Sequence, residues 1–458
     1  MNYISTRGNA KKLNFEGVLL KGLADDGGLY IPESTPVMSA DEINSLSKKT
    51  YQEIAFHIIK KFTGETFPDS VLNEMIFESY KNFTSKSIAP LVEYEKDKYI
   101  MELFHGPTLA FKDIAMQLIS RMLNFILTKR NIDSTIICAT SGDTGGAAVD
   151  AFSSNNRVKL FVLLPDGRVS DVQRRMMTTV KSKNIKILSI DGNFDDCQNI
   201  VKNLFNDHDF SKNVNLSGVN SINWARIMVQ CVYYFTAFSF IEDKDIPINF
   251  IVPTGNFGDV YAGYLAKSMG LPISKLIIAT NINDILKRCI DTGIYEISDV
   301  IPSNSPSMDI QISSNFERLL FDLEGKDPLK VRKCMTLLSD NGKFKLSKNA
   351  HSQLKEMFDA DALDIDETLK TIKHVYLKYN IIIDPHTAVG FGVSLKKPNL
   401  PVVTLSTAHP AKFPETVFEA IGKYPALPTK HKNLHSLSEN IQCMPNNAQK
   451  IKDYIVSQ

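Results

Sequence analysis

Short runs of apolar, often β-branched residues recur along the chain from about residue 100, and longer stretches with apolar residues every three or four positions separate them. The runs are typical of strands buried on both faces, and the stretches of helices packed on a core. The predicted strands are Thr135–Ala139, Leu160–Leu164, Ile185–Ile190, Ile248–Val252, Leu276–Thr280 and Val402–Ser406. The predicted helices are Asp113–Lys129, Ala147–Ser154, Ser170–Val180, Asp195–Phe205, Asn223–Ile241 and Asp259–Ser268.

This alternation of strands and helices predicts an α/β fold with parallel sheet. Because ligands of open α/β sheets bind beyond the carboxyl ends of the strands, we expect the chemistry in the loops after the strands. We expect a catalytic region over residues 96–428, with a smaller subdomain at roughly 105–220, and a polar, peripheral tail over 429–458.

Residues 1–95 lack the alternation and predict a mainly helical N-terminal domain with a few short strands. Helices are expected over Ala40–Ser47, from Ser47 or Thr50 to Phe62, and over Ser70–Phe83.

Composition narrows the function classes. The chain has 458 residues, which is enough for two or three domains, and a net charge of +1, which indicates neither nucleic acid nor an acidic membrane surface as partner. None of the six cysteines forms a CxxC pair, so we expect no metal site and a reducing, cytoplasmic setting. No apolar run is long enough to cross a bilayer.

A lysine stands at the start of a predicted helix. Lys112 closes the segment His105-Gly-Pro-Thr-Leu-Ala-Phe-Lys, in which Gly-Pro marks a turn. The positive end of a helix and apolar neighbours both disfavour an ammonium, so they lower the pKa from about 10.4. A neutral amine is what imine formation with an aldehyde requires. A solvated first-turn lysine explains this segment equally well.

Two glycine-rich loops, 140–146 and 253–259, each follow a predicted strand and precede a helix. Small residues let backbone N–H groups approach an anion, and the helix N-terminus adds positive potential. Neither loop matches the dinucleotide fingerprint or the P-loop. A tight turn with a cap explains either one alone, but two such loops in one sheet indicate two anions, such as a cofactor phosphate and a substrate anion.

Three further segments offer polar groups near helix starts. Ser221, Asn223 and Arg226 combine neutral donors with a guanidinium suited to phosphate, although a capped helix with a surface arginine explains them too. Residues 406–413 follow the last strand and place hydroxyls, a histidine and Lys412 in a loop. Residues 384–390 are equally consistent with a turn and an N-cap.

Taken in order, these segments resemble the threonine synthases, a family of fold-type II enzymes that depend on pyridoxal phosphate (PLP). The resemblance covers nearly the whole chain, and the motifs HGPT-x-AFKD and PTGNFGD are highly specific. It implies a fold like the tryptophan synthase β subunit, with two open sheets flanked by helices plus a mainly helical N-terminal domain. The N-terminal domain resembles the longer, bacterial and fungal group.

The resemblance also implies roles for individual residues. Lys112 would be the catalytic residue and would bond covalently to the cofactor aldehyde, and Thr407 would hydrogen-bond the pyridine nitrogen. The cofactor phosphate would lie in the loop of Gly255, Asn256, Phe257, Gly258 and Asp259. The substrate would be held by Ser141, Asp143, Thr144, Ser221, Asn223 and Arg226, with Lys412 as a weaker candidate.

The implied activity is that of a carbon–oxygen lyase acting on phosphate. It would convert O-phospho-L-homoserine and water into L-threonine and phosphate, the last step of threonine biosynthesis, in a monomer or homodimer. A serine/threonine dehydratase or a phospho-amino-acid lyase is a rival, although neither calls for both the 221–226 site and this N-terminal domain. A catalytically silent binding protein is another rival, opposed by the presence of every required residue. A Rossmann dehydrogenase is set aside because the GxGxxG turn is missing.

Overall fold

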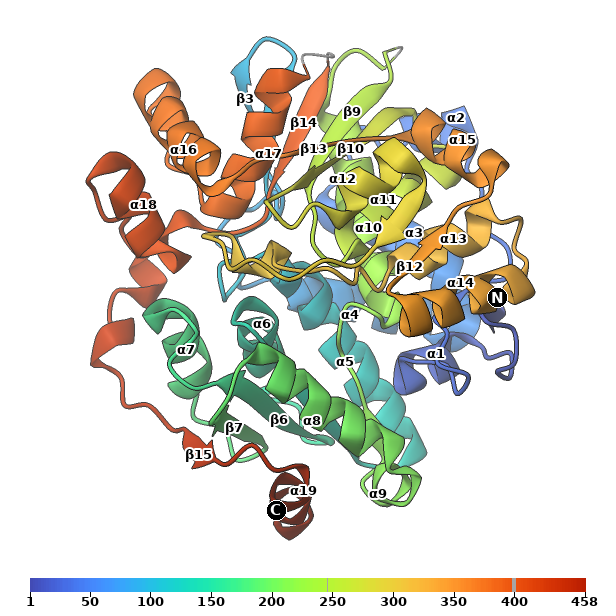
Figure 1. The fold of residues 1–458 in the computed structure, drawn as a ribbon, viewed down its shortest axis with the longest axis vertical. Coiled ribbons are helices and arrows are strands. Elements are labelled where there is room, and N and C mark those ends of the chain that lie inside the picture. The colour runs from blue at the N-terminus through green and yellow to red at the C-terminus, as the bar shows by residue number, and fades with distance from the viewer. Residues whose placement is uncertain (245, 398–400) are drawn as a thin grey trace.

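The computed structural model describes residues 1–244, 246–397 and 401–458, and it contains two main sheets in two lobes (Figure 1). The larger sheet has six strands in the order β13-β10-β9-β14-β4-β3, all parallel except β3. Its strands are β3 (Leu91–Glu95), β4 (Lys98–Glu102), β9 (Ile248–Pro253), β10 (Ile273–Thr280), β13 (Phe358–Ala362) and β14 (Val402–Ser406).

The smaller lobe contains a parallel sheet of five strands in the order β15-β7-β6-β5-β8. Its strands are β5 (Ser134–Ala139), β6 (Val158–Pro165), β7 (Ile185–Ile190), β8 (Leu216–Ser217) and β15 (Gln442–Met444). The helices of this lobe are α6 (Asp143–Phe152), α7 (Asp171–Thr178), α8 (Phe194–Asn206), α9 (His208–Asn213) and α19 (Ala448–Ser457).

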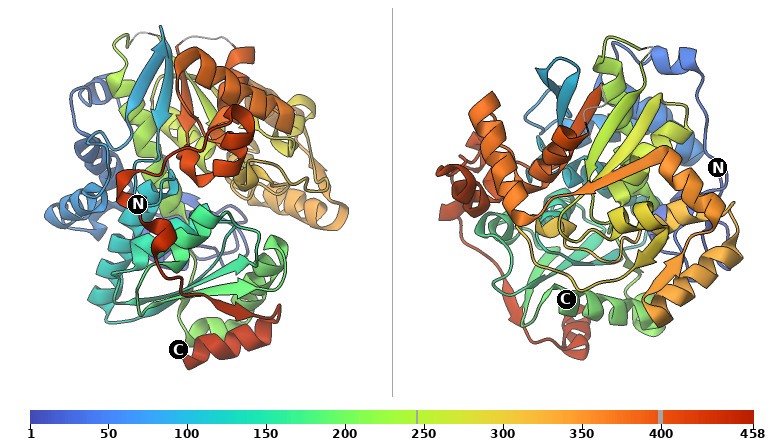
Figure 2. Two further views of the ribbon diagram at one scale, coloured as in Figure 1. Left: turned by 90° about the vertical axis from the view of Figure 1, so that its left-hand side faces the viewer. Right: turned by 45° about the horizontal axis from the view of Figure 1, so that its top comes forward.

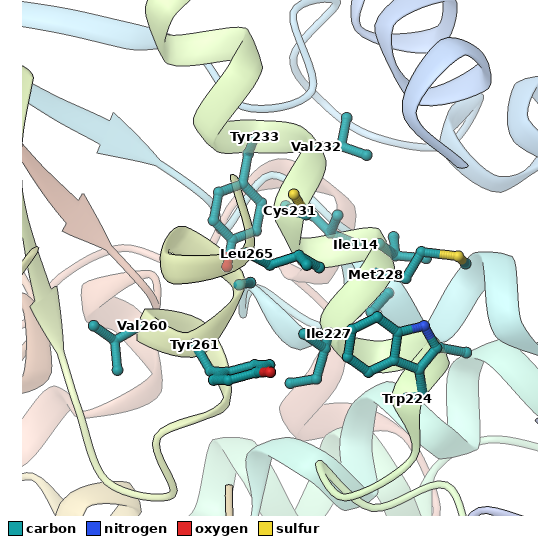
Figure 3. Close-up of a cluster of buried hydrophobic side chains, with 14 of the residues drawn as sticks. Ile114, Trp224, Ile227, Met228, Cys231, Val232, Tyr233, Val260, Tyr261 and Leu265 are labelled. Carbon is teal, nitrogen blue, oxygen red and sulfur yellow. The ribbon is translucent and has the colours of Figure 1, made fainter. Parts of the chain in front are cut away.

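Helices cover the larger sheet, and one of them is buried on nearly every side. That helix is α10, whose sequence is apolar all round, as expected for a helix inside a large core. Side chains of α10 and of α11 belong to one buried hydrophobic cluster (Figure 3). The helices of this lobe are α10 (Trp224–Phe240), α11 (Gly258–Ser268), α12 (Ile285–Thr292), α13 (Phe316–Leu323), α14 (Pro328–Asn341), α15 (Lys348–Met357), α16 (Ile365–Tyr379), α17 (Pro385–Lys396) and α18 (Pro414–Ile421), with a small β11 (Ile294–Glu296)–β12 (Lys343–Lys345) hairpin. Helix α5 (Lys112–Arg130) packs against both α10 and α6 of the smaller lobe.

The N-terminal region packs onto α10 as part of one continuous core. The ring of Trp224 lies 6.0 Å from that of Tyr3 and 5.9 Å from that of Phe62, and the Tyr3 hydroxyl donates to the Phe62 carbonyl at 2.9 Å. The elements of this region are β1 (Tyr3–Ser5), α1 (Phe15–Lys21), β2 (Tyr30–Pro32), α2 (Ala40–Asn44), α3 (Tyr51–Thr63) and α4 (Asp69–Tyr80). Strand β3 pairs with β4 in the larger sheet. The β3–β4 hairpin therefore spans residue 95, the position where we expected the N-terminal domain to end.

The C-terminal segment adds a strand and a helix to the smaller lobe. It crosses from the larger lobe to the smaller one, where β15 forms an edge strand beside β7 (Figure 2). Ile451 and Ile455 of α19 are buried in the core of the smaller lobe. These two residues lie one helical turn apart, so they form part of the apolar face of an amphipathic helix.

Candidate active site

A cavity of about 680 Å³ lies between the two lobes, beyond the carboxyl ends of β5, β9 and β14. Its wall includes side chains or backbone from both glycine-rich loops and from the starts of α5, α6, α10 and α11. The structure therefore brings together segments that are far apart in the sequence. The predicted site residues on this wall are Lys112, Ser141, Asp143, Thr144, Ser221, Arg226, Gly255, Asn256, Phe257, Gly258, Asp259 and Thr407.

Lys112 is the first residue of α5, and its side chain is 13% exposed. Burial lowers the pKa of Lys112, and the positive charges of Lys412 and Arg226 lower it further. Asp143 raises this pKa, because its Oδ2 lies 3.3 Å from the amine. The lowered pKa increases the neutral fraction of an amine that faces the cavity.

Backbone contacts hold Lys112 beside the end of β14. The Phe111 N–H donates to the Thr407 carbonyl at 2.9 Å, and Ala110 forms an isolated antiparallel bridge with Ala408. The side chain of Thr407 is almost fully buried and faces the same cavity. These contacts place a hydroxyl and the amine around one space.

Asp143 is the first residue of α6 and lies between two buried lysines. Its Oδ1 is 2.7 Å from the Lys412 amine and accepts from Gln173 at 2.8 Å, while its Oδ2 faces Lys112. Burial alone would raise the pKa of Asp143, but Lys412 and Lys112 outweigh it and hold the pKa well below its ordinary range. Asp143 is therefore a carboxylate at neutral pH.

Lys412, which we expected as a weaker candidate for the substrate phosphate, binds groups of the protein in this structure. Its side chain is 1% exposed, and its amine binds Asp143 and also donates to the Thr108 carbonyl at 2.7 Å. It is not on the cavity wall. A buried ammonium needs a counter-ion and acceptors, and this one has both within the protein.

The loop after β9 has the properties of an anion site. Within the described residues, no hydrogen bond uses the four backbone N–H groups from Gly255 to Gly258. Phe257 has a φ of 63°, which turns the loop into α11. A side chain at Gly255 would place its Cβ 2.5 Å from the Ser307 carbonyl oxygen, so only glycine fits there.

The loop after β5 offers fewer free donors than its sequence indicates. The N–H groups of Gly142 and Gly145 both donate to the Thr140 hydroxyl, at 3.0 and 2.9 Å. Those of Ser141, Asp143 and Thr144 have no partner among the described residues. The anion-binding part of this loop is therefore narrower than the whole glycine-rich segment.

Arg226 lies in the first turn of α10 and is 2% exposed. Its Nη1 donates to the Val219 carbonyl at 3.2 Å, whereas Nε has no partner and no carboxylate of the described residues pairs with it. Burial lowers the pKa of Arg226 to about 10, so it stays charged. An unpaired buried cation on a cavity wall favours an anionic ligand. Nearby, Ser221 accepts a hydrogen bond from the Asn256 amide.

Asn223 does not contribute to the cavity, and its expected contact with a substrate phosphate finds no support. Its side chain caps α10, accepting from the Ala225 N–H at 3.1 Å and donating to the Leu19 carbonyl at 3.1 Å. Both ends of the amide are thus engaged in joining α10 to α1.

Asp259 lines the cavity but turns toward α10. Its Oδ1 accepts from the hydroxyls of Tyr233 and Tyr234, and its Oδ2 has no partner within the described residues. Burial raises the pKa of Asp259 to about 6, against the tyrosine hydrogen bonds and the charge of Lys112, which lower it.

Two cavity residues were missed in the sequence. Gln230 of α10 is 2% exposed, and its Oε1 has no partner in the described chain. His386 lies two residues after Asp384, the N-cap of α17, and its side chain lines the cavity. The sequence of this segment indicated a turn and an N-cap, which describes the backbone correctly but gives the imidazole no role. Polar residues inside an otherwise apolar helix were the available signal for Gln230.

Comparison with known proteins gives the family. A model of the threonine synthase N terminus matches residues 2–80, one of the threonine synthase C-terminal region matches 387–455, and one of PLP-dependent enzymes matches 88–402. A threonine synthase of Pseudomonas aeruginosa is 46% identical over 99% of this chain and 98% of its own length. The chain belongs to the threonine synthases. Its cofactor is accordingly PLP, and the N-terminal region, the two sheets and the helices match the predicted fold class.

Solved threonine synthases have the same fold. The PLP-bound enzyme of Brucella melitensis is 48% identical, with a TM-score of 0.97 over 99% of this chain and 98% of that one. The yeast threonine synthase is 40% identical, with a TM-score of 0.94 over the same shares. Among the described residues of this threonine synthase, no helix is long and apolar enough to span a membrane.

The cavity fits PLP on its own chemistry. The free N–H groups from Gly255 to Gly258 suit a phosphate, the amine of Lys112 suits an aldehyde, and the hydroxyl of Thr407 suits a ring nitrogen. A second anion site remains beside Arg226 in the same cavity. This threonine synthase therefore has room and donors for a cofactor and a charged substrate together.

Proposed function

We propose that this threonine synthase converts O-phospho-L-homoserine and water into L-threonine and inorganic phosphate in the cavity between the lobes. The observation that carries the proposal is the unpaired, buried guanidinium of Arg226 on the same wall as Lys112 and two anion-binding loops. A substrate with both a carboxylate and a phosphate would use the groups that the cofactor leaves free.

In this proposal Lys112 binds the cofactor covalently, residues Gly255 to Gly258 hold its phosphate, and Thr407 bonds its ring nitrogen. Asp259, at the end of this loop, accepts hydrogen bonds from the tyrosines of α10 and does not contact the phosphate in this proposal. When bound, PLP supplies an electron sink that stabilises negative charge next to the substrate nitrogen.

The substrate carboxylate is assigned to the N–H groups of Ser141, Asp143 and Thr144, which have no other partner in the described chain. The substrate phosphate is assigned to Arg226 and the hydroxyl of Ser221. These two sites fix the substrate by its ends and leave its central carbons beside the amine of Lys112.

Once the substrate's own amine has displaced it, Lys112 would remove the protons at Cα and Cβ as phosphate leaves Cγ, and it would later return protons to Cγ and Cα. Its depressed pKa keeps a fraction of the freed amine neutral. Asp143 opposes that depression and limits it. Phosphate retained beside Arg226 after elimination assists the attack of water at Cβ by accepting a proton.

The proposal includes the cytoplasm as the compartment and a monomer or homodimer that needs no nucleic acid. All six cysteines are free, and five of them are buried. Free thiols without patterned pairs are what a reducing compartment permits.

The test measures threonine and phosphate formation from O-phospho-L-homoserine, alongside 2-oxobutyrate formation from threonine. Arg226→Ala should lower kcat/KM for phosphohomoserine by about 10- to 150-fold, as expected for a charge-assisted hydrogen bond of about 1.5–3 kcal/mol. Arg130→Ala, which removes a half-exposed arginine paired with Glu16, is the control and should have no effect. Dominant 2-oxobutyrate formation by the wild-type enzyme, or unchanged kinetics in Arg226→Ala, would contradict the proposal.

A further inference from the structure

A segment over residues 301–315 lies against the loop that holds the cofactor phosphate. The Ser313 hydroxyl donates to the Gly255 carbonyl at 2.5 Å, and the Ser314 N–H donates to the Asn256 side-chain oxygen at 2.6 Å. The Ser307 carbonyl oxygen would lie 2.5 Å from a Cβ on Gly255, so the segment and the loop pack closely. The position of the phosphate loop therefore depends on where this segment is held.

The segment is organised around the carboxylate of Asp309. Asp309 accepts from the amides of Asn281 and Asn283 at 2.8 and 3.1 Å, and from the Ser303 N–H and hydroxyl at 3.0 and 2.6 Å. Both asparagines follow β10, so this network fixes the segment to the end of a strand of the larger sheet. It does not fix the segment to α17 on the other side.

That second attachment comes from His386. The Ser307 N–H donates to His386 Nε2 at 3.2 Å, and within the described residues this is the one hydrogen bond between residues 301–310 and α17. His386 Nδ1 lies 2.9 Å from Asp384 Oδ1, and both residues are almost fully buried.

The two contacts determine the protonation of the ring. A backbone N–H can only donate, so Nε2 must be the acceptor and carry no proton. A carboxylate can only accept, so Nδ1 carries the proton and donates to Asp384. The N–H groups of His386 and Thr387, together with the Thr387 hydroxyl, also bind Asp384, which leaves that carboxylate little freedom to move.

We infer that His386 is a positioning residue that holds residues 301–315 against the phosphate loop and so retains the cofactor. Asp384 orients the ring, Nε2 fixes Ser307, and the segment supports the phosphate loop through the Gly255 carbonyl and the Asn256 side chain, which leaves the N–H groups from Gly255 to Gly258 free for the phosphate. The inference rests on the proposed cofactor site and adds a residue to which no role was assigned.

Two variants separate the two ends of the ring. His386→Gln places an acceptor near the position of Nε2 and loses the donor to Asp384, whereas His386→Asn keeps a donor near Nδ1 and loses the acceptor for Ser307. Losing one neutral hydrogen bond predicts cofactor release about 2- to 12-fold faster in His386→Asn. The release rate of His386→Gln should stay closer to that of the wild type. The control variant His374→Asn, which changes an exposed histidine, should release the cofactor at the wild-type rate.

Release is followed on purified holoenzyme by cofactor absorbance after dilution, and by the fluorescence of Trp224, the only tryptophan of the chain. Unfolding midpoints of the cofactor-free proteins show whether a variant is merely destabilised. Equal release rates for His386→Asn and the wild type, or the same change in both His386 variants, would overturn the inference.

A measurement without mutation covers the case in which a variant fails to fold. Nitrogen-15 chemical shifts of the wild-type histidines should show a His386 ring protonated at Nδ1 and not at Nε2, and the opposite tautomer would refute the inference. Failure of the proposed function is distinct: it appears as absent threonine formation in the wild type, whereas failure of this inference leaves that turnover intact.

Discussion

Replacing Asp143 with asparagine removes the carboxylate that lies between two buried lysines while keeping the side-chain shape. Lys412 would keep only the Thr108 carbonyl and lose its one counter-ion in the described chain. The Gln173 amide donates to the same Asp143 oxygen as Lys412, so an amide oxygen there could still accept from both donors but would carry no negative charge. The variant therefore leaves a buried ammonium without compensation.

The expected loss is large for one substitution. Asp143 is 4% exposed and Lys412 1% exposed, so solvent screens neither charge. Removing one partner of a buried ion pair costs about 3–5 kcal/mol of folding free energy. Adding Lys412→Met to Asp143→Asn removes the orphaned charge and should recover most of this loss.

The assay is chemical unfolding of cofactor-free protein at several pH values. Because the folded pKa of Asp143 is depressed, its contribution is present above the unfolded pKa of about 3.9 and is lost as pH falls. The difference in unfolding free energy between the wild type and Asp143→Asn should thus be largest at pH 7 and should decrease below about pH 4. Asp171→Asn, which removes a half-exposed carboxylate, should cost about 1 kcal/mol or less. A single variant as stable as wild type at pH 7, or a double variant no better than the single one, would refute the reasoning.

Further outcomes follow from the same structure. Lys112→Ala should abolish threonine formation and leave no borohydride-trapped pyridoxyl adduct on the protein; an adduct at another lysine would contradict the site. Gly255→Ala should weaken PLP binding measured by equilibrium dialysis, because its Cβ would stand 2.5 Å from the Ser307 carbonyl oxygen; unchanged affinity would show that the wall yields easily. Ile451→Ala should destabilise the protein by about 2–5 kcal/mol in urea unfolding, since this side chain is fully buried in the smaller lobe. A loss below 0.5 kcal/mol would mean that α19 is dispensable.

The sequence alone determined the elements whose pattern is local. The predicted strands over Ile185–Ile190 and Val402–Ser406 match β7 and β14, and α5 begins one residue before its predicted start. The glycine-rich loops after β5 and β9 were found for the same reason, because glycine, small residues and helix starts are recognised over a few positions. The shared cofactor role of Lys112 and the 253–259 loop came from the resemblance to a family, and the structure places both on one cavity wall.

Tertiary structure decided which side chains meet. β13 has two aspartates among five residues and gave no strand signal, yet pairing with β10 makes it an edge strand. Asn223 looked like a ligand and is a cap, and Lys412 looked free and is Asp143's partner. The ring of His386 could not be assigned a role without Ser307, which approaches it from another part of the chain. Pattern along a chain reports burial and local geometry, whereas hydrogen bonds and ion pairs between distant residues exist only once the chain has folded.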